Sequence, residues 1–187
     1  DSRENFNYQV AATTRLLAHT SVEQMYVSDC EADDIIGYLA KNILDEEVII
    51  ASSDKDFYQL LKENVRMYSP TKKKIITHED VLEEHDISCV NFATARCFVG
   101  DSSDNIDGVR GVGLKSLAKR FPMLRNDEFV SCDDIIKLCR EVPEKKRIKL
   151  HKNILAAEPI IKRNWKLMYL DTSNLAADQI LKIREKA

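Results

Sequence analysis

Residues 100–115 read GDSSDNIDGVRGVGLK, a stretch that joins two acidic side chains, a glycine-rich turn and the start of a basic helix. Gly108, Gly111 and Gly113 carry no Cβ atom, so their backbone N–H groups can come close to a ligand. A helix that begins near Leu114 would add the positive end of its dipole, which favours an anion. The stretch therefore predicts a phosphate-binding turn that leads into a helix.

The same stretch contains two carboxylates that can hold a cation. Asp101 and Asp104 are separated by a spacing that places both side chains on one side of a single turn. Taken alone, the stretch is better explained as a solvated, Asx-rich loop that caps a helix. Two further acidic clusters, at residues 31–34 and 54–56, stand where an α/β protein presents groups at the carboxyl end of its sheet. The three clusters together favour a metal site.

The composition indicates one globular core with a smaller unit attached to it, since the chain has 187 residues and is 44% hydrophobic. A net charge of -3 argues against a protein that binds nucleic acid with its whole surface. The charges are nevertheless unevenly placed, because acidic residues concentrate in the first two thirds of the chain. Basic residues crowd the last third: Lys115, Lys119, Arg120, Lys145, Lys146, Arg147, Lys149 and Lys152. This asymmetry suits a metal-holding half joined to a phosphate-holding half, although solvated helix faces also explain the run at 145–152.

The five cysteines are an odd number, form no Cys-x-x-Cys pair and have no histidine at zinc spacing. We therefore expect reduced, mostly buried thiols. No apolar run approaches the roughly 20 residues that span a bilayer, and no signal sequence is visible. The sequence predicts a soluble, intracellular, cytoplasmic protein without a membrane contact.

Hydrophobic periodicity predicts an α/β fold in which strand, acidic cluster and helix recur in that order. Strands are expected at 25–27, at 47–52 as a central parallel strand, at 65–68, and at 74–77 as an antiparallel edge. Helices are expected at 10–19, 33–44, 57–61, 91–99, 114–121, 133–140, 144–153 and 154–164. Asp33 and Asp34 are expected in the first turn of the second of these helices, and Pro159 at a helix start or kink. A capping box of Thr77 and Asp80 is expected before a further helix, and an extended segment at 165–170. A core at 1–100 and a helical region at 101–187 follow from this order.

The acidic clusters have individual explanations, since acids favour the first turn of a helix and Asp54 and Asp56 can form a turn. Together they would repel: two unit charges 4 Å apart cost about 4 kcal/mol at an effective dielectric of 20. Divalent cations remove that cost, and ligation by oxygen alone favours Mg²⁺ or Mn²⁺ over Zn²⁺. Two such ions about 4 Å apart can stabilise both oxygens of a phosphodiester displacement. The residues therefore predict a hydrolytic nuclease.

Three ordered motifs resemble the consecutive signatures of the flap endonuclease and 5′-3′ exonuclease family. They are EADDIIG at 31–37, SSDKDFYQLL at 52–61, and GDSSDN at 100–105 followed by GVRGVGLK at 108–115. This family includes bacteriophage 5′ nucleases and the 5′-nuclease domain of bacterial DNA polymerase I. The resemblance covers nearly the whole chain and implies a PIN-like, Rossmannoid α/β core, with a mostly parallel sheet, and a helix-three-turn-helix unit.

The resemblance also implies roles for individual residues. The implied metal ligands are Glu31, Asp33, Asp34, Asp54, Asp56, Asp101 and Asp104, of which Glu31, Asp33, Asp54 and Asp56 are the implied catalytic residues. The implied DNA-binding residues are Gly108, Arg110, Gly111, Gly113, Lys115 and Lys119, and the backbone carbonyls of Gly108, Val109 and Val112 are candidates for a K⁺ site. The expected partner is DNA with a flap, a nick or an RNA-primed end, bound by a monomer.

The sequence departs from the family pattern at its front. Members of the family begin with a strand that carries an essential Asp, then a second Asp, then a helical arch that threads single-stranded 5′ ends. No such first strand is visible here, and residues 1–6 can be a remnant of the second motif. The leading hypothesis is a Mg²⁺-dependent, structure-selective 5′ nuclease. A catalytically impaired junction-binding module is the second hypothesis, and a small PIN-type ribonuclease is disfavoured because such proteins lack the GVRGVG unit.

Overall fold

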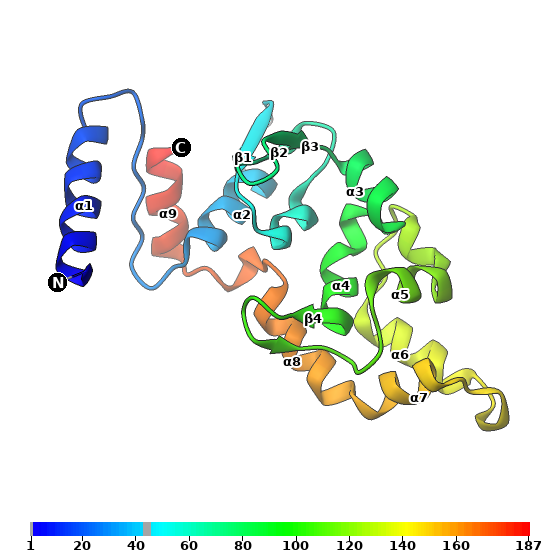
Figure 1. The fold of residues 1–187 in the computed structure, drawn as a ribbon. Coiled ribbons are helices and arrows are strands. Elements are labelled where there is room, and N and C mark those ends of the chain that lie inside the picture. The colour runs from blue at the N-terminus through cyan, green and yellow to red at the C-terminus, as the bar shows by residue number, and fades with distance from the viewer. Residues whose placement is uncertain (1, 43–45) are drawn as a thin grey trace.

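The computed structural model describes residues 2–42 and 46–187 and shows an α/β protein in which helices predominate over a small sheet (Figure 1). The sheet contains β1 (Val48–Ala51), β2 (Val65–Ser69) and β3 (Lys74–Ile76), in that order. β1 runs parallel to β2, and β2 runs antiparallel to β3. The α/β class and the antiparallel edge are therefore confirmed.

β1 lies at the edge of this three-stranded sheet, whereas its continuous apolar sequence predicted a central strand. The central position belongs to β2, whose Val65 is fully buried. On β1, Ile50 is buried, but Ile49 is 54% exposed and lines an apolar groove with Leu39 of helix α2 (Ala32–Asn42). The prediction was wrong because an apolar run reports side-chain contacts on both faces of a strand and not the number of its hydrogen-bonded neighbours.

The strand predicted at residues 25–27 is also wrong, because this segment pairs with no strand in the described part of the chain. Val27 is buried, but it packs against Ile35 and against Ile183 of helix α9 (Ala177–Lys186). Contacts between side chains therefore bury this segment without a β-ladder.

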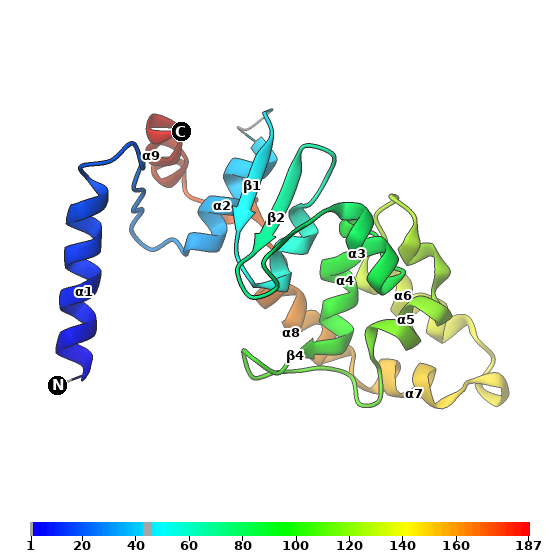
Figure 2. The same cartoon turned by 45° about the horizontal axis from the view of Figure 1, so that its top comes forward.

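Helix α1 (Ser2–Leu17) includes most of the helix predicted at 10–19 and begins earlier than predicted. None of its residues is buried, and in Figures 1 and 2 it stands apart from the other elements. A hydrogen bond of 3.0 Å from Gln24 Nε2 to the carbonyl of Thr14 joins it to the segment that follows. Asp1, the first residue of the candidate remnant, lies outside the described residues.

The elements around β1 follow the predicted order. α2 begins directly after Glu31, with two acidic residues in its first turn, as predicted. The predicted helical positions Ile43 and Leu44 lie outside the described residues. A 3-10 helix, η1 (Lys55–Leu60), follows β1 and takes the place of the short helix predicted at 57–61. Strand, acidic cluster and helix therefore succeed one another here.

Helix α3 (His78–His85) begins with the predicted capping box. The backbone N of Thr77 donates to the Asp80 carboxylate at 2.8 Å, and the backbone N of Asp80 donates to the Thr77 hydroxyl at 3.2 Å. The next helix, α4 (Cys89–Val99), ends at Gly100 as predicted. All but two residues of α4 are buried, and this helix packs against η1 and α8 at the centre of the molecule.

The second half of the chain is mainly helical, as predicted, but it opens with a short hairpin that was not predicted. Two-residue strands are too short to give a period-two pattern in the sequence. The elements are β4 (Gly100–Asp101), β5 (Ile106–Asp107), α5 (Leu114–Arg120), η2 (Pro122–Arg125), α6 (Cys132–Glu141), η3 (Glu144–Lys146), α7 (Lys149–Ala156), α8 (Glu158–Met168) and η4 (Thr172–Asn174).

The helix predicted at 144–153 is interrupted between η3 and α7. Arg147 lies in the interruption, and its guanidinium donates to the carbonyls of Arg140 at 2.7 Å and Val142 at 2.9 Å. These carbonyls belong to the end of α6, where helices leave carbonyls without intrahelical partners. The prediction failed because this tertiary contact competes with helix continuation.

The segment predicted as a helix at 154–164 is helical, divided between α7 and α8 at Ala157, but the prediction of an extended segment at 165–170 is wrong. α8 begins within the first range, with Pro159 in its first turn, and then includes most of the second range. Trp165 and Tyr169 stack with ring centroids 4.2 Å apart, a contact that helical spacing creates. Trp165 and Tyr169 therefore lie on one side of the end of α8, whereas Leu167 is 60% exposed and Met168 is buried.

One hydrophobic core includes residues on both sides of position 100, among them Ile50, Phe98 and Leu117. The division of the chain at 100/101 therefore stays a prediction. The five cysteines are free thiols and four of them are buried, which confirms that most are buried. Within residues 2–42 and 46–187, no helix is both long enough and apolar enough to cross a bilayer.

Candidate metal centre and phosphate-binding turn

The second acidic cluster lies directly after the carboxyl end of β1. Asp54 is the N-cap of η1, because its carboxylate accepts from the backbone N of Asp56 at 2.8 Å. The backbone N of Asp54 donates in turn to the hydroxyl of Ser52 at 3.1 Å. These bonds orient Asp54 and Asp56 from a rigid turn. The turn that the sequence offered as a purely structural role for Asp54 and Asp56 is therefore present. It uses the backbone N of Asp56, and the Asp56 carboxylate takes no part in it.

Three carboxylates from two distant segments meet beside this turn. Asp56, Asp101 and Asp104 each offer one oxygen, and these oxygens all lie within 4.8 Å of one another. Asp56 and Asp101 are partly buried, whereas Asp104 is exposed on the loop between β4 and β5. A cleft of about 550 Å³, which we call the acidic cleft, is lined by Ser53, Asp54, Lys55, Arg96, Val99, Gly100, Asp101, Ser102, Ser103 and Asp104.

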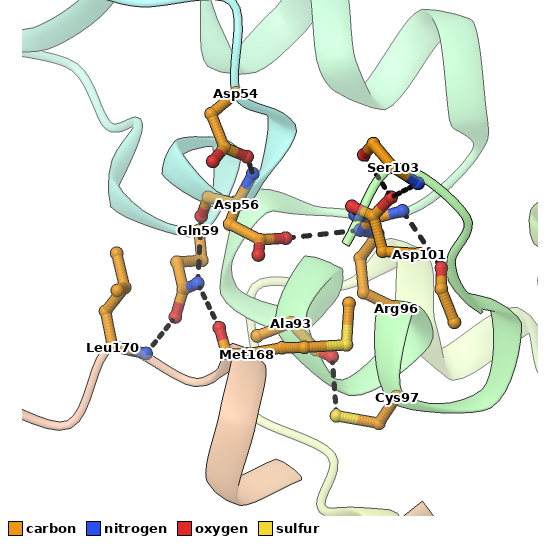
Figure 3. Close-up of polar contacts among 11 residues, drawn as sticks. Asp54, Asp56, Gln59, Ala93, Arg96, Cys97, Asp101, Ser103, Met168 and Leu170 are labelled. Carbon is orange, nitrogen blue, oxygen red and sulfur yellow. Dashed lines mark hydrogen bonds and ion pairs between the residues drawn. The ribbon is translucent and has the colours of Figure 1, made fainter. Parts of the chain in front are cut away.

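Arg96 of α4 is the site residue that sequence reasoning missed. Its side chain is buried and donates to Asp56 Oδ1 at 3.2 Å, to the carbonyl of Gly100 at 3.1 Å, and to Asp101 (Figure 3). A buried guanidinium requires such acceptors, because an unpaired buried charge is costly. The signal was present in the sequence, since Arg96 is the only charged residue within residues 89–99.

The two acids beside Arg96 have opposite pKa shifts. Burial raises the pKa of Asp56 to about 6, against the attraction of Arg96, and the nearby charges of Asp54 and Asp101 add to the increase. Burial also acts to raise the pKa of Asp101, but hydrogen bonds from Ser103 and the charge of Arg96 outweigh it and hold that pKa below its usual value. The Ser103 backbone N and hydroxyl donate to Asp101 at 2.8 and 2.5 Å, and Asp56 lacks an equivalent donor pair.

The first acidic cluster lies at the start of α2, outside the group of three carboxylates. Asp34 accepts from the backbone N of Glu31 at 3.2 Å, as an acid in the first turn of a helix commonly does. Glu31 is exposed. Burial raises the pKa of Asp33, and the charges of Asp54 and Asp104 contribute to that increase. Charged residues of the acidic cleft thus influence the pKa of Asp33. A role for the first cluster in metal binding stays a prediction.

The turn at residues 108–113, which we call the glycine-rich turn, begins where two backbone segments cross. A Cβ on Gly108 would lie 2.0 Å from the carbonyl oxygen of Val99, and a Cβ on Gly100 would lie 2.4 Å from the backbone N of Gly108. Gly100 also has a positive φ of 78°. These two glycines are therefore required for the crossing of the chain upon itself, a function that the sequence interpretation did not assign to Gly108.

The other two glycines fit the sequence interpretation more closely. Gly111 has a φ of 74°, and a Cβ there would meet nothing nearer than Asn153 Nδ2 at 4.0 Å. Gly113 is the N-cap of α5, and a Cβ there would meet no atom within 4 Å. Both are exposed, so a ligand can approach this side of the turn.

A side chain of α7 supports the glycine-rich turn, and the basic residues in and after the turn are exposed. Asn153 Nδ2 donates to the carbonyl of Arg110 at 2.7 Å. The backbone N of Val112 donates to the carbonyl of Val109 at 3.0 Å, so one lone pair of this candidate K⁺ ligand is already engaged. The side chains of Arg110, Lys115 and Lys119 belong to exposed residues. The guanidinium of Arg147 differs from these side chains, because it donates to the carbonyls of Arg140 and Val142 at the end of α6. A phosphate-binding role for the run at 145–152 stays a prediction.

The chain is similar to known 5′-3′ exonucleases. Residues 1–86 match the family model of the 5′-3′ exonuclease N-terminal resolvase-like domain. The chain is 35% identical over 123 residues to a 5′-3′ exonuclease of Buchnera aphidicola subsp. Schizaphis graminum, which covers 63% of this chain and 43% of that protein. It is 33% identical over 154 residues to the thermostable DNA polymerase I of Thermus filiformis, which covers 81% of this chain and 18% of the polymerase. The chain thus spans less than half the length of these two relatives.

Solved structures give the same result. A protein of bacteriophage T5 co-crystallised with metal ions superposes with a TM-score of 0.75 at 26% identity, over 98% of this chain and 66% of that one. The T5 flap endonuclease in a pseudo-enzyme-product complex with DNA and metal ions gives a TM-score of 0.78 at 26% identity, over 98% of this chain and 68% of that one. The fold is therefore the PIN-like α/β fold of the T5 nuclease with its helical unit. The resemblance to the flap endonuclease and 5′-3′ exonuclease family is confirmed.

Proposed function

We propose that this chain is the core of a structure-selective 5′ nuclease that hydrolyses DNA phosphodiesters with two divalent cations, in replication or repair. The observation that carries the proposal is the group formed by Asp56, Asp101 and Asp104, whose oxygens lie within 4.8 Å of one another. This group lies beside a glycine-rich turn in a chain similar to flap endonucleases. DNA with a flap, a nick or an RNA-primed end is the proposed substrate, bound by a monomer in the cytoplasm.

The donor set fits Mg²⁺ or Mn²⁺. All candidate ligands are carboxylate oxygens, and opposite ligands of Mg²⁺ are roughly 4 Å apart because each Mg–O distance is about 2.0–2.1 Å. The 4.8 Å spread of Asp56, Asp101 and Asp104 is close to that requirement. The second ion would use Asp54 together with Glu31, Asp33 and Asp34. When bound, two such ions supply Lewis acidity and neutralise the charge that develops on the attacking and leaving oxygens.

The residues of the chain itself hold and orient the reacting groups. Arg96 fixes the Asp56 and Asp101 carboxylates, since it contacts both. The exposed backbone of Gly111 and Gly113 and the side chains of the basic helix hold duplex phosphates, and the carbonyls of Gly108, Val109 and Val112 are the proposed K⁺ ligands. Phosphate contacts position the substrate and read no base sequence, so the selectivity is for the shape of the junction.

Cleavage of a 5′-labelled flap, with and without Mg²⁺, tests the proposal. We expect Mg²⁺-dependent release of short 5′ products from the flap and little cleavage of the same sequence as a plain single strand. Asp101→Asn should abolish this release, because it removes a charge from the acidic cleft. Asp86→Asn is the matched control, since Asp86 is an exposed residue at the end of α3. Release that is unaffected by a chelator would contradict the proposal.

A catalytically impaired junction-binding module is the second candidate, and one observation favours it. Arg96 pairs with two of the three grouped carboxylates, Asp56 and Asp101, and so neutralises part of the charge that would attract a cation. In this case the chain would bind a flap junction with nanomolar to micromolar affinity but release no product at any Mg²⁺ or Mn²⁺ concentration. Calorimetric titration with Mn²⁺ separates the candidates, because the nuclease binds two ions and the impaired module binds fewer.

A further inference from the structure

We infer that Asn164 is a positioning residue that fixes the acidic cleft relative to the glycine-rich turn and thereby selects the bond that is cut. The inference rests on the proposed function. Asn164 lies on α8, more than 40 residues after the last quoted motif, and no motif of the sequence includes it. It is completely buried, with 0% of its surface exposed. A buried amide of this kind is costly unless its polar atoms are bonded.

The Asn164 side chain is fully bonded. Its Nδ2 donates to the carbonyl of Cys97 at 2.9 Å and to the carbonyl of Asp107 at 2.8 Å. Its Oδ1 accepts from Nε and Nη2 of Arg163 at 3.2 and 2.9 Å. Both donors and the acceptor therefore have partners, which holds the amide in one orientation.

The two carbonyls that Asn164 joins belong to the two parts of the site. Cys97 follows Arg96, the residue that contacts Asp56 and Asp101 in the acidic cleft. Asp107 precedes Gly108, where the glycine-rich turn begins and the backbone crosses the end of α4. One amide thus ties the end of the helix that bears the cleft to the residue from which the turn departs.

The backbone segments at Gly100 and Gly108 cross in close contact, so neither segment can shift far relative to the other. Asp107 directly precedes Gly108, and its position therefore fixes where the glycine-rich turn begins. The backbone N of Val109 donates to the carbonyl of Phe98 at 2.7 Å and adds a second tie at the same place. If the Asn164 amide is lost, the carbonyls of Cys97 and Asp107 lose their shared buried donor, and the weaker contact of Arg163 Nη2 at 3.4 Å is the side-chain donor that remains at Asp107. The hairpin is then held less firmly against the end of α4. A shift of about 1 Å at a reacting centre can cost roughly 100-fold in rate.

The test compares Asn164→Leu with Ile161→Val on a 5′-labelled flap. Ile161 lies on the same helix and is also fully buried, so its variant controls for lost stability. We expect Asn164→Leu to lower kcat roughly 100-fold and to spread cleavage over neighbouring bonds, with KM for DNA close to that of the parent. Ile161→Val should lower the melting temperature and leave the cleavage position unchanged.

Arg163→Met gives a second, milder variant that keeps the inference testable if Asn164→Leu does not fold. Arg163 is exposed, and its Nη2 also donates to the carbonyl of Asp107 at 3.4 Å. Its loss should broaden the cleavage pattern in the same direction and to a smaller extent. A single, unshifted cleavage position in both variants would overturn the inference, and so would an equal broadening by Ile161→Val.

A readout that needs no hydrolysis separates this inference from the proposed function. Fe²⁺ with ascorbate and hydrogen peroxide produces hydroxyl radicals that cut bound DNA close to the ion, whatever the enzyme does. If the parent binds DNA but hydrolyses nothing, the proposed function fails, and a radical pattern that shifts in Asn164→Leu still supports the inference. If the parent hydrolyses DNA and the radical pattern does not shift in Asn164→Leu, the inference fails and the proposed function stands.

Discussion

Helices α4 and α1 differ in how much of their surface is buried. Nearly every residue of the 11-residue α4 is buried, including Phe92, Ala95 and Phe98 with 0% exposure. In the 16-residue α1 no residue is buried, and Phe6 is 65% exposed. Isolated helices shorter than about 12–15 residues are marginal in water. The 11-residue α4 is therefore stabilised by packing, whereas the longer α1 depends largely on its own backbone hydrogen bonds.

The difference shows where this chain can place chemistry that needs fixed geometry. The buried helix presents Arg96 toward Asp56 and Asp101, and its end supports the crossing at Gly100 and Gly108. The exposed helix contributes no residue to the lining of the acidic cleft in the described part of the chain. A helix of the first kind suits a metal centre, since the ligands must be held within about 0.5 Å of the productive geometry.

The largest expected effect is on catalysis beside the buried helix. The double variant Asp54→Asn, Asp56→Asn should lose hydrolysis by several orders of magnitude, because it removes two carboxylates from one end of the acidic cleft. Duplex binding in Ca²⁺ should persist, since the glycine-rich turn is unchanged. Rates of flap cleavage and DNA affinity measure the two effects. Cleavage close to the parent rate would show that the cations are held elsewhere.

Truncation of matched aromatic residues tests the comparison directly. Phe98→Ala should lower the free energy of unfolding by about 3–5 kcal/mol, because it empties a closed part of the core. Phe6→Ala removes the same atoms from an exposed site and should change it by less than about 0.5 kcal/mol. Urea denaturation monitored by the fluorescence of Trp165 measures both. Equal losses would mean that α1 is packed as tightly as α4.

The raised pKa of Asp56 predicts how cation binding depends on pH. A carboxyl whose pKa rises from 3.8 to about 6 on folding keeps its proton in the folded state, so its contribution to stability is largest at low pH and falls as the pH rises through 6. A cation must displace this proton. Affinity for Mn²⁺ should therefore fall up to about tenfold per pH unit below 6. Calorimetry at pH 5, 6 and 7 should show this slope, and Asp56→Asn should bind more weakly without it.

The smallest expected effect concerns the exposed basic helix after the glycine-rich turn. Lys115→Ala should weaken DNA binding about equally for all sequences and lower the slope of log K against log salt by about one unit. Lys182→Ala on α9, which lies far from α5 in Figure 1, is the control with the same change of charge. An unchanged slope in Lys115→Ala would indicate a solvated residue without a phosphate contact.

Much of the fold could be read from local patterns. The capping box of Thr77 and Asp80, the end of α4 at Gly100 and the acids Asp33 and Asp34 in the first turn of α2 depend on residues close in sequence, and all three are present. The predictions that failed involve more distant partners. β1 is an edge strand, residues 25–27 form no strand, and Arg147 interrupts a predicted helix by capping the end of α6.

Carboxylates, glycines and lysines at fixed spacing are visible without any fold, so local patterns name the candidate residues of the site. The tertiary structure brings some of these candidates together. It grouped Asp56 with Asp101 and Asp104, placed the guanidinium of Arg96 between two of them, and assigned Gly108 to a backbone crossing. The physical reason is that charge pairs, burial and close backbone contacts arise between residues far apart in the chain, whereas periodicity and capping report only on neighbours.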